Sequence, residues 1–256
     1  MDTEASRYYP FFMALDSVRL ITFDCYGTLI DWETGMLKAM RPLFGGGEPS
    51  RDIELLALYS EVESELESGP YMRYRRVLSY TVQEMGSRLD LKITQEDGER
   101  FAESLTTWEP FADTVAALQR LATNYRLGII SNTDDDLFAE TKKKLGVDFD
   151  PIVTAQQVKS YKPSHRNFEE ALRRAGLPPA SLPKEQVLHA GQSVFHDVIP
   201  ATELGLRTVW VNRPSIRPGA GAAKAAVGVP TFQVSSVAAL ADLLLGQLKS
   251  GSQAAS

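Results

Sequence analysis

The chain has 256 residues, of which 43% are hydrophobic and 23% are charged, so it is long enough to bury a sizeable core. This length suits one α/β domain with a smaller insert. A net charge of −6 argues against a surface for nucleic acid or for an acidic membrane. The single cysteine, Cys25, excludes an internal disulfide framework and favours a reducing cytoplasm.

The first twelve residues lack the basic start and apolar stretch of a signal peptide. The sequence contains no run of about 18 apolar residues, so no transmembrane helix is predicted.

The first predicted strand ends at Asp24, after a β-branched and aromatic run and before the turn-forming Gly27. Open α/β sheets bind ligands at the carboxyl ends of their strands, and a carboxylate there can act as a covalent nucleophile. A capping or turn aspartate explains this segment equally well.

Four helices are predicted after Asp31, with no strand between them. Apolar residues recur in this region at steps of three and four, which is the spacing of one helical face. Loops rich in Gly and Pro at residues 45–49 and 68–70 divide it. We therefore expect a helical insert over residues 33–109. Its predicted helices are Glu33 to Leu43, Asp52 to Glu67, Tyr71 to Leu89 and Thr94 to Thr107.

From Pro110 onward helices and strands alternate, as a parallel sheet with crossover helices requires. The sequence therefore predicts an α/β fold with a doubly wound parallel sheet, formed by residues 1–32 and 110–248. Pro214 to Pro230 is a predicted loop, and Lys249 to Ser256 a predicted disordered tail. The predicted helices are Phe111 to Ala122, Asp134 to Leu145, Ser164 to Ala175 and Ser236 to Leu248. The strand candidates are Arg126 to Ser131, Ile152 to Val158, Gln186 to Ala190 and Arg207 to Asn212.

Three later strand candidates lead, like the first, into polar residues. These are Ser131 and Asn132, the tripeptide Tyr161-Lys162-Pro163, and the segment from Gly191 to Asp197. Together with Asp24, and in this order, the segments resemble those of the haloacid dehalogenase superfamily. The resemblance covers Val18 to Leu245. It implies a Rossmann-like core and identifies residues 33–109 as the cap domain that closes over the nucleophile.

Two positions differ from the superfamily's phosphatases. Tyr26 stands where those enzymes carry a second aspartate as general acid, and Gln192 stands where an acidic residue helps to hold magnesium. A halide leaves as a weakly basic anion and needs neither device. The chain thus resembles the branch that hydrolyses 2-haloalkanoic acids to 2-hydroxy acids. A phosphatase acting on a small phosphate ester and a non-catalytic ligand-binding relative stay open as alternatives.

The resemblance also implies roles for individual residues. Asp24 would attack the carbon that bears the halogen, Lys162 would keep Asp24 ionised, and Asp197 would activate the water that hydrolyses the ester. No metal and no cofactor are expected. The expected partner is a small halogenated carboxylate, with a homodimer left open. The expected substrate-binding residues are Tyr26, Thr28, Ser131, Asn132, Gln192 and Ser193.

One expected feature is missing. Family members carry an arginine in the second cap helix that helps to hold the departing halide, and the matching stretch Leu58 to Glu61 contains none. Arg73, Arg75 and Arg76 are the nearest substitutes, although a solvated basic face is the favoured interpretation.

Two histidines and the cysteine leave further choices. His189 and His196 lie seven residues apart with no accompanying cysteine, so a zinc site is not expected. His196 either reaches the active site as a supporting partner or is a packed or exposed histidine. Cys25 has no evident base partner and is interpreted as a small packed residue.

Overall fold

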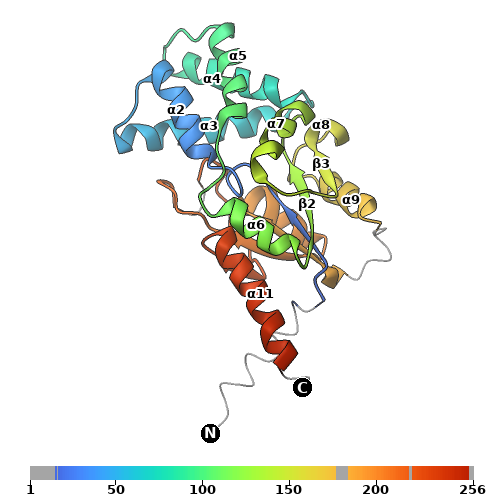
Figure 1. The fold of residues 1–256 in the computed structure, drawn as a ribbon. Helices are drawn as coiled ribbons and strands as arrows, with labels where there is room; N and C mark the ends of the chain where they lie inside the picture. Colours follow the sequence, from blue (N-terminus) through green and yellow to red (C-terminus); the bar gives the residue numbers. More distant parts are fainter. Residues whose placement is uncertain (1–14, 16, 177–183, 219–220, 254–256) are drawn as a thin grey trace.

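The computed structural model describes residues 15, 17–176, 184–218 and 221–253 (Figure 1). The first twelve residues, in which no signal peptide is expected, lie outside the described range. Within it, no helix has the length and apolar character needed to cross a membrane.

Six parallel strands form one sheet in the order β3-β2-β1-β4-β5-β6. The central strand β1 is buried along its whole length, as its β-branched and aromatic residues favour. Phe23 pairs with Ile129 of β2 and with Ala190 of β4, so the residues that follow these strands meet at one edge. The strands are β1 (Leu20–Phe23), β2 (Arg126–Ser131), β3 (Ile152–Thr154), β4 (Val187–Gly191), β5 (Arg207–Val211) and β6 (Phe232–Val234).

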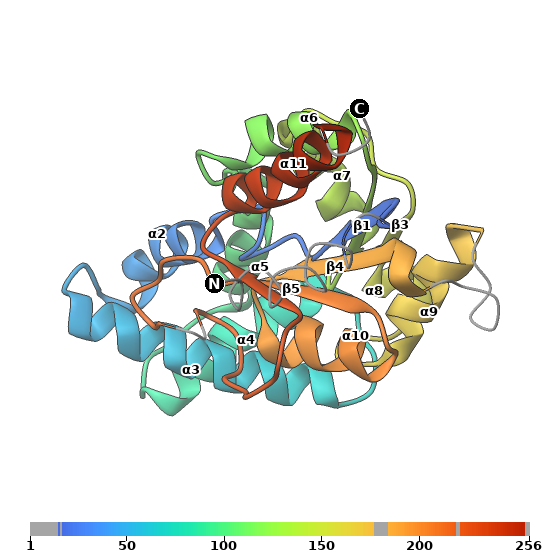
Figure 2. The ribbon, with the colours of Figure 1, turned by 90° about the horizontal axis from the view of Figure 1, so that it is seen from below.

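Helices cover both faces of the sheet, which confirms the predicted doubly wound α/β fold. Figure 2 shows α6 and α11 on one face and α9 and α10 on the other. The core helices are α6 (Thr114–Ala122), α7 (Asp135–Leu145), α8 (Ala155–Val158), α9 (His165–Arg174), α10 (Ile199–Glu203) and α11 (Val237–Gln253).

The predicted helical insert follows β1 and lies beyond the carboxyl edge of the sheet (Figure 1). Asp31 caps its first helix by accepting a hydrogen bond from the backbone of Thr34 at 3.2 Å. Thr94 and Asp97 form a reciprocal capping box at the start of its last helix. The four helices are α2 (Trp32–Phe44), α3 (Pro49–Ser68), α4 (Tyr74–Arg88) and α5 (Gln95–Ser104).

Several elements differ from the sequence-based expectations. The strand candidate Ile152 to Val158 divides after Thr154, because the Thr154 side chain accepts from Gln157 N at 3.3 Å and starts α8. Strand β6 and helix α10 were not predicted, since each spans only three to five residues. Helix α11 continues to Gln253, into the expected disordered tail, and residues 254–256 lie outside the described part.

Candidate active site

The turn after β1 fixes Asp24 at the carboxyl edge of the sheet. Asp24 N donates to Ala190 O at 3.0 Å, which continues the pairing of β1 with β4. The chain then reverses, and Leu29 N and Ile30 N both donate to Cys25 O. Gly27 adopts φ +90 in this turn, and a Cβ there would lie 2.7 Å from Trp32 Nε1. Both the backbone conformation and the close contact therefore require glycine.

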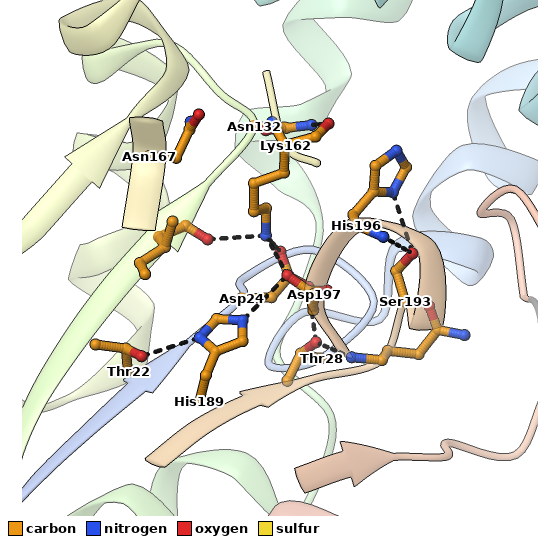
Figure 3. Close-up of polar contacts among 12 residues, drawn as sticks. Thr22, Asp24, Thr28, Asn132, Lys162, Asn167, His189, Ser193, His196 and Asp197 are labelled. Atoms are coloured by element: carbon orange, nitrogen blue, oxygen red, sulfur yellow. Dashed lines mark hydrogen bonds and ion pairs between the residues drawn. The ribbon is translucent and has the colours of Figure 1, made fainter. Parts of the chain in front are cut away.

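Three buried charges meet at this edge (Figure 3). Lys162 Nζ donates to Asp24 Oδ1 at 2.8 Å, to Asp197 Oδ1 at 2.6 Å and to Ile130 O at 2.9 Å. The exposed fraction is 2% for Lys162, 0% for Asp197 and 8% for Asp24. The ammonium thus uses all three donors and joins two carboxylates that would otherwise repel each other.

Burial and charge act against each other on these groups. Burial disfavours the ammonium of Lys162, but attraction to Asp197 and Asp24 outweighs it and raises the pKa of Lys162. Burial also raises the pKa of Asp24, against the opposing effect of Lys162. For Asp197, Lys162 and His189 overcome the cost of burial and lower the pKa to about 2. Asp197 is therefore the more firmly ionised carboxylate of the two.

Thr28 holds the second oxygen of Asp24. Its hydroxyl donates to Asp24 Oδ2 at 2.7 Å and accepts from Gln192 N at 2.8 Å. The hydrogen bonds of the hydroxyl therefore orient the carboxylate. The sequence predicts that Thr28 binds either the substrate or the nucleophile. In the structure its hydroxyl contacts the nucleophile, Asp24.

Asp197 is held by His189 and by a glycine. His189 lies between Thr22 Oγ1 at 2.9 Å and Asp197 Oδ1 at 3.2 Å, which makes it a donor to the carboxylate through one nitrogen. The other oxygen, Asp197 Oδ2, is buried and has no hydrogen-bond partner among the described residues. A Cβ on Gly191 would lie 2.5 Å from that oxygen. Asp197 thus has one oxygen without a described hydrogen-bond partner, held at a fixed position beside Gly191.

We expect Gly191→Ala to lower kcat by about 10- to 100-fold, because the added methyl group must displace Asp197. Overpacking should also lower the free energy of unfolding by about 1–3 kcal/mol. Steady-state kinetics and urea denaturation measure the two effects. The matched control is Gly246→Ala, where a Cβ meets open space. Wild-type kinetics in the Gly191 variant would show that the position of Asp197 is not critical.

The triangle lies at the base of a pocket between the sheet edge and the helical insert. The cavity measures about 40 Å³, which suits a ligand of few heavy atoms. Its lining residues come from the end of β2, from the segments that follow β1, β2 and β4, from the loop between α8 and α9, and from α2, α3 and α4 of the insert. They are Asp24, Tyr26, Trp32, Glu63, Glu67, Tyr74, Ser131, Asn132, Lys162, Gln192, Ser193, His196 and Asp197.

Two glutamates of α3 face this pocket. Glu63 Oε1 accepts from Tyr59 Oη at 2.8 Å and from Tyr74 Oη at 2.7 Å. Burial raises the pKa of Glu63 to about 7. The side chain of Glu67 is 7% exposed. Burial and the nearby Glu63 raise the pKa of Glu67 well above its usual range. The insert therefore contributes acids to the pocket, whereas the family resemblance implies an arginine there.

We expect protein stability to fall as pH rises from about 4.5 to about 7. Glu63 has a raised pKa in the folded state, so the folded state binds more protons than the unfolded state in this window. The part due to Glu63 is on the order of 3 kcal/mol and is complete above its folded pKa, whereas Glu67, whose pKa is also raised, continues the fall at higher pH. Urea denaturation across the window measures it. Glu63→Gln should flatten the profile, and an equally steep profile in that variant would assign the effect elsewhere.

The remaining predicted residues lie in or beside the pocket, with contacts of their own. Ser131 Oγ is buried and has no partner among the described residues. Asn132 accepts from Lys162 N at 2.7 Å, and its amide lies 3.3 and 3.4 Å from the two Glu67 oxygens. The hydroxyl of Tyr26 bonds Thr141 at 2.9 Å. Ser193 accepts from the backbone of His196 at 3.0 Å and so caps the π-helical turn Val194–Val198.

The candidate arginines do not reach the pocket. Arg73 and Arg75 form ion pairs with Asp136 of core helix α7 at 3.4 and 2.9 Å, and Arg76 donates to Tyr80. Arg73 and Arg75 are partly exposed but paired with acidic side chains, so they differ from the simple solvated basic face that was the favoured interpretation.

The other open choices are also resolved. His196 lines the pocket, and burial lowers its pKa to about 4, so it is neutral at neutral pH. Cys25 is buried, and burial raises the pKa of its thiol well above the usual range, as expected for a packed residue.

Glu63, Glu67 and His189 were not assigned to the site from the sequence. Acidic residues four apart on a helix are typical of a solvated face. A signal was nevertheless present, because Tyr59, Glu63 and Glu67 follow each other at four-residue steps on the face that begins with buried Leu55 and Leu56. His189 lies in the buried strand β4, and its spacing from His196 indicates neither a zinc site nor a contact with Asp197.

The two carboxylates of the site are already paired with a cation that belongs to the protein itself. Lys162 bridges the two carboxylates, and the neighbouring Gln192 side chain is a neutral amide. Among the residues that the structure describes, no group of three or more His, Cys, Asp or Glu side chains could hold a metal ion. Independence from metal stays a prediction for experiment.

Comparison with known proteins places the chain in a family. Residues 18–205 match the family model of the haloacid dehalogenase-like hydrolases. An (S)-2-haloacid dehalogenase of Pseudomonas putida is 26% identical over 242 residues, covering 91% of this chain and 100% of that protein. A glyceraldehyde 3-phosphate phosphatase of Methanothermobacter thermautotrophicus is 32% identical over 205 residues, covering 76% and 86% of the two chains.

The fold agrees with this result. The crystal structure of the L-2-haloacid dehalogenase from Xanthobacter autotrophicus superposes with a TM-score of 0.72 at 20% identity, covering 90% of this chain and 99% of that one. The resemblance inferred from the four sequence segments is confirmed at the level of the superfamily. The chain belongs to the haloacid dehalogenase-like hydrolases.

Proposed function

We propose that this hydrolase converts small 2-haloalkanoic acids to 2-hydroxy acids through an ester on Asp24. The observation that carries the proposal is the buried triangle of Asp24, Lys162 and Asp197, in which one oxygen of Asp197 is left free. The Pseudomonas putida relative, an (S)-2-haloacid dehalogenase aligned over its full length, adds support.

In the first step, a carboxylate oxygen of Asp24 attacks the carbon that bears the halogen. The carbon–halogen bond breaks, the halide leaves with the bonding electron pair, and an aspartyl ester forms. Lys162 and Thr28 bind the two oxygens of Asp24 and so hold it in place for the attack. The hydroxyl of Ser131, which lacks a described partner, is a donor for the substrate carboxylate.

In the second step, a water bound to Asp197 Oδ2 attacks the carbonyl carbon of the ester. Asp197 accepts one proton of the water, and the bond between the ester carbonyl carbon and the alkoxy oxygen breaks. The departing alkoxide takes that proton from Asp197 and leaves as the hydroxy acid, and the second water proton is released as Asp24 returns to its carboxylate form. His189 and Lys162 are positioning residues for Asp197 in this step, since each binds its other oxygen.

We further propose that residues 33–109 act as a cap domain over a core of residues 1–32 and 110–248. The pocket draws residues from both parts, so a substrate held there is enclosed by the cap. Asn132, Gln192, Ser193 and Tyr26 are the remaining proposed contacts of the substrate. A cytoplasmic location stays a prediction from the single cysteine.

Halide release from chloroacetate and 2-chloropropionate tests the function directly. We expect turnover to survive EDTA and not to rise with added magnesium, because Tyr26 and Gln192 replace the acidic groups of a magnesium phosphatase. Ion chromatography of released chloride measures it, with phosphate release from small phosphate esters assayed in parallel.

A phosphatase is the second candidate, because the Methanothermobacter relative at 32% identity is a glyceraldehyde 3-phosphate phosphatase. Magnesium-dependent hydrolysis of phosphate esters faster than that of any haloacid would favour it. An ester trapped on Asp24 in an Asp197→Asn variant, identified by mass spectrometry, would support the dehalogenase.

A further inference from the structure

The pocket wall opposite the nucleophile carries acids. Asp24 belongs to the sheet edge, whereas Glu63, Glu67 and Tyr74 come from the insert. In a displacement at carbon, the leaving group departs on the side away from the attacking oxygen, and therefore toward the insert. Among the described residues that line the pocket, Lys162 is the only permanently charged cation, and its three donors are occupied. A departing halide thus finds no free cation there.

The contacts of the two glutamates decide which of them carries a proton. Two phenol hydroxyls donate to Glu63, and such donors stabilise a carboxylate. Glu67 lies one helical turn further along α3, and the described residues that contact its carboxyl are Asn132, through long amide hydrogen bonds, and His196, whose Nε2 lies 3.7 Å away. Lys162 attracts Glu67, but its ammonium is already bound to Asp24 and Asp197, so the two neighbouring buried glutamates share a proton, because both cannot ionise at low cost. The hydrogen bonds assign the negative charge to Glu63 and the proton to Glu67.

We propose that protonated Glu67 is the residue that receives the leaving group, in place of the missing arginine. Its O–H donates a hydrogen bond to the halogen as the carbon–halogen bond breaks, the halide takes the bonding electron pair, and Glu67 keeps its proton. The identity of the leaving group rests on the proposed haloacid chemistry. A neutral O–H donor in a small cavity favours small halides that accept strong hydrogen bonds, which are fluoride and chloride rather than iodide.

Among the groups in this part of the pocket, we expect Glu67 to be the one that loses its proton on the alkaline side of neutrality. Lys162 stays charged, because its pKa is raised. His196, whose Nε2 lies 3.7 Å from Glu67, is neutral above about pH 4. Glu63 ionises near neutrality, with a pKa of about 7. The remaining titratable or charged groups near Glu67 are Tyr59, Tyr74, Tyr161 and Lys224.

Three variants test the proposal by their pH profiles with chloroacetate. Glu67→Leu removes the donor and should lower kcat by about 10- to 100-fold. Glu67→Gln keeps an N–H donor that does not titrate, so it should retain most of the activity and lose the alkaline fall of the wild-type profile. The matched control is Glu61→Gln on the outer side of α3, where Glu61 binds Arg88 at 2.9 Å. This control should keep the wild-type profile.

Halide binding gives a readout that needs no turnover. In Asp24→Asn, line broadening of the chloride NMR signal should report a site that binds chloride on the acidic side of neutrality and weakens on the alkaline side. Glu67→Leu in the same background should abolish the broadening. Circular dichroism and thermal melting of each variant exclude loss of fold as the cause.

The two sets of data separate the possible failures. If no haloacid is turned over but chloride binding still follows Glu67, the proposed function fails and the leaving-group site stands. The inference itself is overturned if the alkaline fall persists in Glu67→Gln, or if chloride binds equally well without Glu67. It is also overturned if methylammonium, used as a probe cation, binds in a Glu67-dependent way, because the two glutamates would then form a cation site.

Discussion

Asp24→Asn should abolish haloacid turnover, by on the order of 10⁶-fold, because an amide cannot form the ester intermediate. The amide is nearly isosteric with the carboxylate and can still bind Thr28, so the fold should persist. Chloride release from freshly purified protein measures the effect, and mass spectrometry excludes deamidation back to aspartate. The matched control is Asp31→Asn, since asparagine caps α2 as well as aspartate does.

Labelling with oxygen-18 distinguishes a nucleophile from a general base at Asp24. A single turnover in labelled water, with enzyme in excess, should leave the label in Asp24 and give mostly unlabelled hydroxy acid. Multiple turnovers should then label the product. Fully labelled product in the single turnover would mean that water attacks the substrate directly, and the covalent mechanism would be abandoned even if halide were released.

Lys162→Met should be the most destabilising single change in the site. It leaves two buried carboxylates without their common partner, which costs about 3–5 kcal/mol in the free energy of unfolding. It should also raise the pKa values of Asp24 and Asp197, because the ammonium no longer favours their ionised forms. The acidic limb of the rate profile then moves to higher pH. Urea denaturation and pH-dependent kinetics measure the two effects.

A surface lysine provides the control for this change. Lys142 binds the fully exposed Asp148 at 3.2 Å, and Lys142→Met should leave stability unchanged within error. Asp197→Asn added to Lys162→Met removes one of the stranded charges and should recover part of the lost stability. An unchanged free energy of unfolding in Lys162→Met would show that the buried carboxylates are accommodated by protonation alone.

Much of the core could be predicted from the sequence, because its signals are local. The apolar run before Asp24 and the run Arg126–Ser131 are each bounded by turn or polar residues, and both are strands in the structure. The carboxyl ends of parallel strands share one edge, so Asp24, Ser131 and Lys162 could be expected to meet there. The structure does bring them together around a single ammonium.

The wall contributed by the insert could not be predicted in the same way. The orientation of α3 over the sheet edge decides which of its faces meets the pocket, and that orientation depends on contacts between segments far apart in the chain. Glu67, for example, meets Asn132, which lies 65 residues away. Likewise, the hydrogen bond between His189 and Asp197 depends on the π-helical turn after β4, which periodicity does not reveal.

The strand order bears on how the chain folds during synthesis. Strand β1 lies between β2 and β4, which begin more than 100 residues later, at Arg126 and Val187. The ribosome therefore delivers the nucleophile long before either neighbouring strand exists. The contacts within residues 33–109 are close in sequence and can form in the meantime. We expect the helical insert to be structured first, and β1 to stay unpaired until the second half of the chain has emerged.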